Sequence, residues 1–240
     1  MTWTDITPRR GVLLTAATLP LAAATAWLSA RSHPAFRDVL EPVQLATSVL
    51  VPFFGVLAVT TLHRPPTNPR PAPQPPTAQP PPAQPPAAQP PAAHLLVPRL
   101  LVPLGLAAGF AVAGTLLAAM ATGWPPVSRA ATLLLASVLV QMIAQLVGTG
   151  CGLLLWRPAL AMAATIVVPM GVTVLLGTID PSGGLVRWLT PYGNAHALLM
   201  GRPSVPAFAV VVLLWCVVPN LLGTWRLNRA ARRQLPAERF

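Results

Sequence analysis

The chain has 240 residues, of which 54% are hydrophobic and only 9% are charged, and its mean hydropathy is +0.61. Soluble domains carry about a quarter charged residues, so a chain this poor in charge could not cover a water-facing surface. The composition therefore excludes a soluble globular protein. All 16 basic residues are arginines, and against five acidic residues they give a net charge of +11.

This positive charge does not indicate a nucleic-acid partner. Nucleic-acid binders gather basic residues on one soluble face, whereas these arginines stand at the edges of long apolar runs, as they do in membrane proteins. The absence of lysine also excludes an ATP-binding P-loop, whose lysine contacts the terminal phosphates. Any use of ATP must therefore come from another chain.

Six apolar stretches are long enough to cross a bilayer, which takes about 20 residues of helix. The first follows Arg9 and Arg10, but it is too long for the apolar part of a signal peptide and a second stretch follows closely, so we expect it to be retained. The pattern predicts an all-α fold, an integral membrane bundle of six transmembrane helices. The predicted spans are Gly11–Ala30, Val43–Leu62, Leu100–Thr122, Ala130–Trp156, Pro158–Thr178 and Val205–Trp225.

The arginines predict the orientation, because positively charged flanks stay on the cytoplasmic side. With both termini inside, eleven arginines flank cytoplasmic ends and five flank outer ends. We therefore expect a multi-pass protein of the cell membrane with both termini in the cytoplasm. The cytoplasmic set is Arg9, Arg10, Arg64, Arg70, Arg99, Arg157, Arg226, Arg229, Arg232, Arg233 and Arg239, and the outer set is Arg31, Arg37, Arg129, Arg187 and Arg202.

A proline-rich segment separates the second and third spans: 15 of the 34 residues from Pro65 to Pro98 are proline. Proline has no amide donor and fixes its own φ, so we expect a disordered cytoplasmic loop and neither helix nor strand. A weak five-residue repeat either is a tolerated expansion or docks a proline-binding partner. In this repeat, glutamines precede pairs or triplets of proline at Gln74, Gln79, Gln84 and Gln89.

These features divide the chain into four parts. Residues 1–64 hold a short cytoplasmic N-terminus and the first two spans, residues 65–98 are the proline-rich linker, residues 99–225 hold the last four spans, and residues 226–240 form a basic cytoplasmic tail. The tail is either a solvated stop-transfer segment or a docking segment for anionic lipid or protein.

Two pairs of glycines predict close helix packing. In lipid, helices associate where small residues let their backbones approach. Gly105 and Gly109 form one such pair in the third span, and Gly148 and Gly152 form another in the fourth. Each pair predicts a helix contact, either within the bundle or across a dimer.

Three polar residues share one face of the fourth span. Gln141, Gln145 and Thr149 recur every four residues, and a helix turns once in 3.6 residues. An unpaired amide in hydrocarbon is costly, so this face either bonds another helix or lines a substrate path. Asn220 in the sixth span has the same two interpretations, and it or the fifth span is a plausible partner of the glutamines.

Acidic residues are missing from the predicted spans. Proton- or sodium-driven carriers commonly hold ionisable groups near the membrane midplane, so their absence argues against an ion-coupled carrier. His196 has no evident second ligand, so we expect no metal site and no cofactor. The five acids fall at ends or in loops: Asp5, Asp38, Glu41, Asp180 and Glu238.

Two connections between the later spans are distinctive. Only Trp156 to Pro158 separates the fourth and fifth spans, which predicts a tight hairpin with Arg157 at a cytoplasmic turn. The outer loop from Ile179 to Ser204 is weakly apolar and contains Trp188 and Tyr192. We expect it to enter the membrane interface as short helices.

A family pattern covers the chain from Leu146 to Met200. The fourth span is rich in glycine, a basic turn follows, the fifth span is rich in alanine with a proline in its middle, and the outer loop has an aromatic and proline element. The residues that carry this pattern are Gly148, Gly150, Gly152, Arg157, Pro169, Trp188 and Pro191. In these residues, and in its six-span outline, the chain resembles bacterial ABC transporter permeases of the type-2 exporter family.

The resemblance implies a function for the chain. It would be the permease subunit of an ATP-driven exporter, catalysing nothing itself, pairing with a second copy or a sister permease, and powered by a separate ABC ATPase subunit. Two features depart from the family pattern: only Met1 to Arg10 is available as an N-terminal interface helix, and the proline tract interrupts the loop that usually contacts the ATPase. The alternative is a non-transporting membrane protein that recruits a cytoplasmic partner through its proline-rich loop.

Overall fold

The computed structural model describes residues 8–32, 35–60 and 92–234, with side chains in 11–32, 35–60 and 100–230. Within these ranges the regular elements are helical and none is a strand. Six helical segments of the described chain are long and apolar enough to cross a membrane. The predicted all-α bundle is thus confirmed, and the protein is a multi-pass membrane protein.

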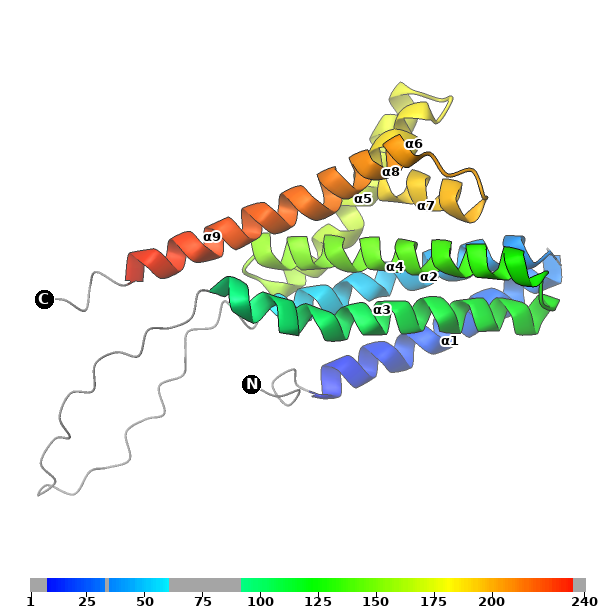
Figure 1. Ribbon diagram of the computed structural model, residues 1–240, viewed down its shortest axis with the longest axis horizontal. Coiled ribbons are helices and arrows are strands. Elements are labelled where there is room, and N and C mark those ends of the chain that lie inside the picture. The colour runs from blue at the N-terminus through cyan, green and yellow to red at the C-terminus, as the bar shows by residue number, and fades with distance from the viewer. Residues whose placement is uncertain (1–7, 33–34, 61–91, 235–240) are drawn as a thin grey trace, which may run out of the picture.

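Figure 1 shows α1 to α4 lying lengthwise beside one another, with α9 diverging from them and the short helices α6, α7 and α8 gathered near one end. The sixth span consists of α8, a π-helical segment and α9. The bounds are α1 Pro8–Ser32, α2 Phe36–Thr60, α3 Ala92–Thr122, α4 Val127–Leu154, α5 Pro158–Ile179, α6 Gly184–Leu189, α7 Pro191–Leu199, α8 Val205–Val211, the π-helical segment Val212–Val217 and α9 Val218–Gln234.

Two helices, α2 and α3, begin about two turns before their predicted spans. α2 begins at Phe36, so Asp38, Glu41 and Pro42 lie in its first two turns, where an acidic residue is favoured by the helix dipole. α3 begins at Ala92, so the prediction of a non-helical linker is wrong for residues 92–98. This stretch holds a single proline among alanines and leucines that favour helix. The rest of the proline-rich segment, residues 61–91, lies outside the described residues.

α2 is the central helix of the bundle. It packs against α1, α3 and α4. In the most apolar stretch of α2, 61% of the residues are buried, against 11% in that of α5. Its Leu40 and Val43 join Ala118 of α3 and Leu133 of α4 in one apolar cluster. α5 is left with most of its apolar surface facing outward, which suits contact with lipid or with another membrane chain.

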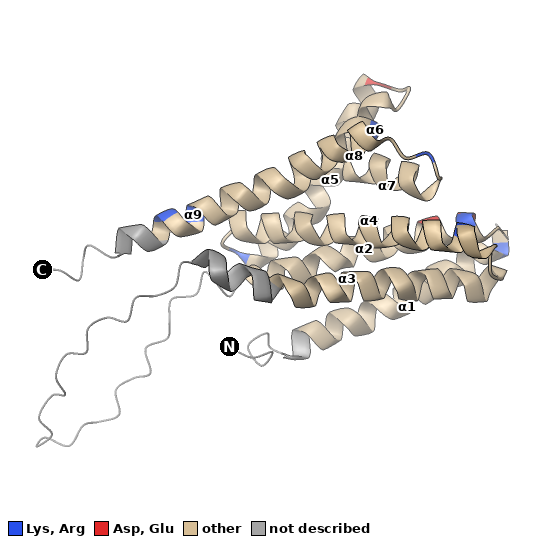
Figure 2. Cartoon of the chain, viewed as in Figure 1, with Lys and Arg blue, Asp and Glu red and all other residues tan. Residues whose placement is uncertain are grey.

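The charged residues lie at the two ends of the bundle, as the colours of Figure 2 show for the described residues. Arg37 and Arg129 stand at the end where α2 and α4 begin, which we call the α7 end. Arg157 and Arg226 stand at the other end, which we call the Arg157 end. The sequence prediction grouped these arginines in the same two sets.

Both distinctive connections take the predicted form. α4 ends at Leu154 and α5 begins at Pro158, so the tight hairpin is confirmed, with Arg157 exposed immediately before α5. The predicted short helices after the fifth span are α6 and α7. The Thr190 hydroxyl caps α7 by accepting a hydrogen bond from the Gly193 amide at 3.0 Å.

The sequence analysis missed the π-helical segment of the sixth span. It precedes Pro219, which has no amide to donate and whose ring crowds the carbonyl four residues earlier. The neighbouring Asn220 makes a side-chain bond at the same place: its side-chain nitrogen donates to the Cys216 carbonyl at 2.6 Å. Pro219 was the available signal for this irregularity.

Candidate functional site

Buried polar side chains line the contact between α2 and α4. We call the set Gln44, Thr47, Gln141, Gln145 and Thr149 the polar seam. None of these residues is more than 1% exposed. A buried amide or hydroxyl without a partner costs about 4–8 kcal/mol by transfer estimates, and in the seam only the Gln141 side-chain oxygen lacks a partner in the described chain.

Gln141 joins α4 to α2 through its side-chain nitrogen. This nitrogen donates to the Gln44 backbone carbonyl at 2.9 Å, to the Gln44 side-chain oxygen at 3.0 Å and to the Thr47 hydroxyl at 2.7 Å. Gln44 in turn donates to the Ala111 carbonyl of α3 at 2.9 Å. One chain of amides therefore ties α4, α2 and α3 together.

Gln145 bonds the backbone of α2 directly. Only one orientation of its side-chain amide satisfies the neighbouring groups: the nitrogen donates to the Val51 carbonyl at 2.7 Å and the oxygen accepts from the Gly55 amide at 2.8 Å. Val51 and Gly55 stand four residues apart, as do the two partners of a helical hydrogen bond. The Gln145 side-chain amide thus bonds both the carbonyl and the amide of one such backbone pair in α2.

Glycines bring the two backbones close enough for these bonds. A Cβ atom on Gly148 would lie 2.0 Å from the Pro52 carbonyl oxygen, and one on Gly152 would lie 2.6 Å from a Val59 methyl carbon. On the other helix, a Cβ on Gly55 would lie 2.7 Å from the Gln145 carbonyl oxygen. The predicted packing role of Gly148 and Gly152 is confirmed, and it lies within the chain.

Gly105 and Gly109 behave differently. Nothing described lies within 4 Å of a Cβ built on either residue, so of the two predicted alternatives the contact within the bundle is not found among the described residues. α3 instead meets α2 at Gly114, where a Cβ would lie 2.9 Å from the Gln44 side-chain nitrogen. Contact of Gly105 and Gly109 with a second copy stays a prediction.

Asn220 is not the partner of the glutamines, which corrects that expectation. Its side-chain nitrogen donates to the Leu146 carbonyl of α4 at 2.9 Å, and a Cβ on Gly150 would lie 2.8 Å from Pro219. Asn220 therefore holds the sixth span against a different face of α4. Thr149 donates to the Gln145 carbonyl of its own helix at 3.0 Å.

Sequence reasoning missed Gln44 and Thr47 as partners in the seam. The signal was available, because they are polar residues three apart in the second apolar run and so share a helix face. The sequence does not show which apolar run packs against the fourth span, because that depends on tertiary packing.

An apolar cavity of about 440 Å³ lies beside the seam, among α2, α4, α5 and α7. Its wall includes Pro52 of α2, Val147 of α4, Pro169 of α5 and Tyr192 of α7, and Ser48 and Thr165 also line it. None of the four predicted pathway residues, Gln141, Gln145, Thr149 and Asn220, lines it.

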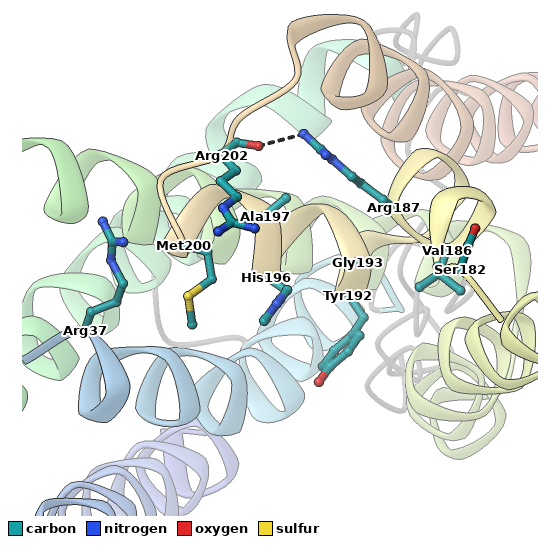
Figure 3. Close-up of a pocket in the computed structure, with 11 residues that line it drawn as sticks. Arg37, Ser182, Val186, Arg187, Tyr192, Gly193, His196, Ala197, Met200 and Arg202 are labelled. Carbon is teal, nitrogen blue, oxygen red and sulfur yellow. Dashed lines mark hydrogen bonds between the residues drawn. The ribbon is translucent and has the colours of Figure 1, made fainter. Parts of the chain in front are cut away.

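A second cavity, of about 590 Å³, lies at the α7 end. We call it the arginine cavity because Arg37, Arg187 and Arg202 line it, together with His196 and Tyr192. Figure 3 shows these residues arranged around α7. The His196 Nδ1 contacts the Glu41 carboxylate, and the described residues contain no group of three or more His, Cys, Asp or Glu that could hold a metal ion.

Asp180 organises the entry to α6 beside this cavity. Its carboxylate accepts from the Ser182 hydroxyl, from the Ser182 amide at 3.0 Å and from the Leu185 amide at 2.8 Å. These hydrogen bonds, that of the Ser182 hydroxyl first, lower the pKa of Asp180 below its ordinary value. The carboxylate is thus engaged in holding the loop.

Comparison with protein-family models, with curated proteins and with solved structures finds no match.

Proposed function

We propose that the chain is the membrane-spanning permease subunit of an ATP-driven ABC exporter, powered by a separate ATPase subunit. The observation that carries the proposal is the order of elements in the second half of the bundle. A glycine-packed α4 turns through Arg157 into the proline-containing α5, and the α6–α7 pair leads on to the sixth span. This is the order in which the sequence resembles the exporter permeases.

The buried hydrogen bonds support a structural role for the four pathway candidates. Gln141 and Gln145 bond α2, Asn220 bonds the Leu146 carbonyl, and Thr149 is fully buried between helices. Such a bundle moves as a unit, and the substrate path then runs between this chain and a second copy or a sister permease. ATP binding to the partner would supply the differential free energy that shifts the path between inward-open and outward-open states.

The proposal includes a location and an orientation. The protein lies in a bacterial cell membrane with its Arg157 end and both termini in the cytoplasm, because that arrangement keeps eleven of the sixteen arginines inside. The ATPase would contact the Arg157 turn or the segment from Trp3 to Arg10. The chain has no lysine for a P-loop, so ATP would be bound by the ATPase subunit, and the proposal includes no cofactor for this chain.

Purification from native membranes tests this proposal. We expect an ABC ATPase subunit among the chains that remain bound to the tagged protein. Arg157→Glu should reduce its recovery, because the charge at the contact is reversed, while Arg129→Glu at the α7 end should not. Recovery of a proline-binding protein in place of an ATPase would contradict the proposal and favour the recruiting role of the proline-rich loop.

A further inference from the structure

The arginine cavity brings together three cations from separate segments of the chain. Arg37 lies in the first turn of α2, Arg187 lies in α6, and Arg202 follows α7. The Arg187 guanidinium donates to the Arg202 carbonyl at 2.8 Å, which ties α6 to the segment after α7 (Figure 3). The fold, and not the sequence spacing, creates this concentration of charge.

The turn at Gly201 sets two of these arginines in place. The Gly201 amide donates to the Leu198 carbonyl at 3.0 Å and the Arg202 amide donates to the Ala197 carbonyl at 2.8 Å, which is the Schellman pattern that ends a helix. Gly201 has φ +68°, and a Cβ there would lie 2.9 Å from an Arg37 guanidinium nitrogen. Glycine therefore permits both the turn and the approach of Arg37.

No carboxylate of the described residues neutralises these arginines. The cavity wall contains neither aspartate nor glutamate. Glu41 contacts His196 instead. The Asp180 carboxylate accepts hydrogen bonds from Ser182 and Leu185. The exposed Asp38 forms no ion pair with the three arginines.

Two of the guanidinium groups also carry an unsatisfied donor. The Nε atoms of Arg37 and Arg187 are buried and have no hydrogen-bond partner in the described chain. A buried donor on a cation is costly until an acceptor reaches it. The cavity thus combines three positive charges with room for an acceptor, and two of its arginines carry buried donors that no group of the described chain satisfies.

We propose that the arginine cavity binds a phosphate group. Guanidinium groups match the oxygen geometry of phosphate in paired hydrogen bonds, and three cations exceed what a single carboxylate would neutralise. The same wall contains Val186, Met200 and Tyr192, which suit an organic group attached to the phosphate. The phosphate belongs either to the headgroup of an anionic phospholipid or to a soluble phosphate compound. This proposal needs no ATPase and stands apart from the proposed exporter function.

The test uses the full chain purified in detergent. Retained dioleoylphosphatidylglycerol is counted by native mass spectrometry against phosphatidylcholine, and radiolabelled inorganic phosphate is measured by equilibrium dialysis. The combined variant Arg37→Gln/Arg187→Gln/Arg202→Gln should weaken binding by about tenfold or more, since it removes all three charged donors. Arg129→Gln, at the same end but outside the cavity, is the matched control and should bind as the native chain does.

The outcomes separate the two sources of phosphate. Lipid retention that inorganic phosphate does not displace assigns the cavity to a phospholipid headgroup, and binding of inorganic phosphate alone assigns it to a soluble compound. If the triple variant does not fold, Arg202→Gln replaces it; this side chain is exposed, and we expect its loss to weaken binding by about threefold. Equal binding by the cavity variants and Arg129→Gln would overturn the proposal. So would phosphatidylglycerol retention no higher than that of phosphatidylcholine together with no measurable binding of inorganic phosphate.

Discussion

Single atoms decide how close α2 and α4 come. Gly148 faces the Pro52 carbonyl so closely that a methyl group has no room, and Gln145 reaches the α2 backbone only because of that approach. In lipid, where the hydrophobic effect contributes little to helix association, such contacts supply much of the stability.

Gly148→Ala should therefore destabilise the bundle. Its Cβ would lie 2.0 Å from the Pro52 carbonyl oxygen, and overpacking of this kind costs about 1–3 kcal/mol. The measurement is thermal unfolding in detergent. Gly171→Ala on α5 is the matched control: nothing described lies within 4 Å of its Cβ, and alanine favours helix over glycine, so its stability should be equal or slightly higher. An unchanged melting temperature for Gly148→Ala would mean that the two helices are farther apart.

Asp180 gives the α6 cap a dependence on pH. Its pKa is lowered in the folded chain, so the cap is complete above the ordinary carboxyl pKa and is lost as the pH falls through the lower folded value. The Leu185 amide donates a hydrogen bond to the Asp180 carboxylate. At neutral pH, Asp180→Asn should therefore speed hydrogen exchange at this amide. Protection of this amide should fall in acid for the native chain and change little for the variant. Equal protection in both chains at neutral pH would argue against the cap.

The pairing of α2 with α4 is the central contact between elements. The four-residue spacing of Gln141, Gln145 and Thr149 was enough to predict one shared face away from lipid, because helix periodicity is local. Their partner was not predictable: the sequence pointed to Asn220 or the fifth span, whereas the bonds go to Gln44, Thr47 and the α2 backbone. Spacing also could not say which of the two glycine pairs meets a neighbour within the chain: Gly148 and Gly152 do, whereas Gly105 and Gly109 meet no described residue.

Changing both glutamines to leucine tests whether they hold these elements together. Gln141→Leu/Gln145→Leu should lower the free energy of unfolding by about 0.6 kcal/mol per hydrogen bond lost, the average for membrane proteins. Transport should fall only as far as folded protein falls. Thr173→Val on α5 is the control, because its hydroxyl bonds only the Pro169 carbonyl of its own helix. Intact stability with abolished transport would instead make the glutamines part of the substrate path.

At the scale of the whole molecule, the charged ends and the apolar middle define a membrane protein. The long apolar runs of the sequence predicted the six spans, because the cost of placing charge in lipid acts on every segment alike. The helix starts at Phe36 and Ala92 were missed, since charge or proline near a helix end is tolerated where water reaches it. The arginine cavity could not be predicted, because its residues come from three segments that only the fold brings together.

The two-sided arrangement of arginines predicts which residues face the cytoplasm. Single cysteines at Ala88 and Ser182, in a chain lacking Cys151 and Cys216, should respond differently to an impermeant thiol reagent in intact cells. Ser182 is exposed at the α7 end, so its cysteine should be labelled, and the cysteine at Ala88 should be labelled only after lysis. Labelling of Ala88 but not Ser182 in intact cells would invert the orientation.

ATP turnover by the purified proteins tests the exporter function most directly. The chain alone should hydrolyse no ATP, because it lacks the lysine that a P-loop requires. The same chain reconstituted in membrane with the ABC ATPase recovered beside it should hydrolyse ATP faster than that ATPase alone, and Arg157→Glu should reduce the stimulation while Arg129→Glu leaves it. ATP hydrolysis by the isolated, contaminant-free chain, or an ATPase rate that the chain does not change, would contradict the account.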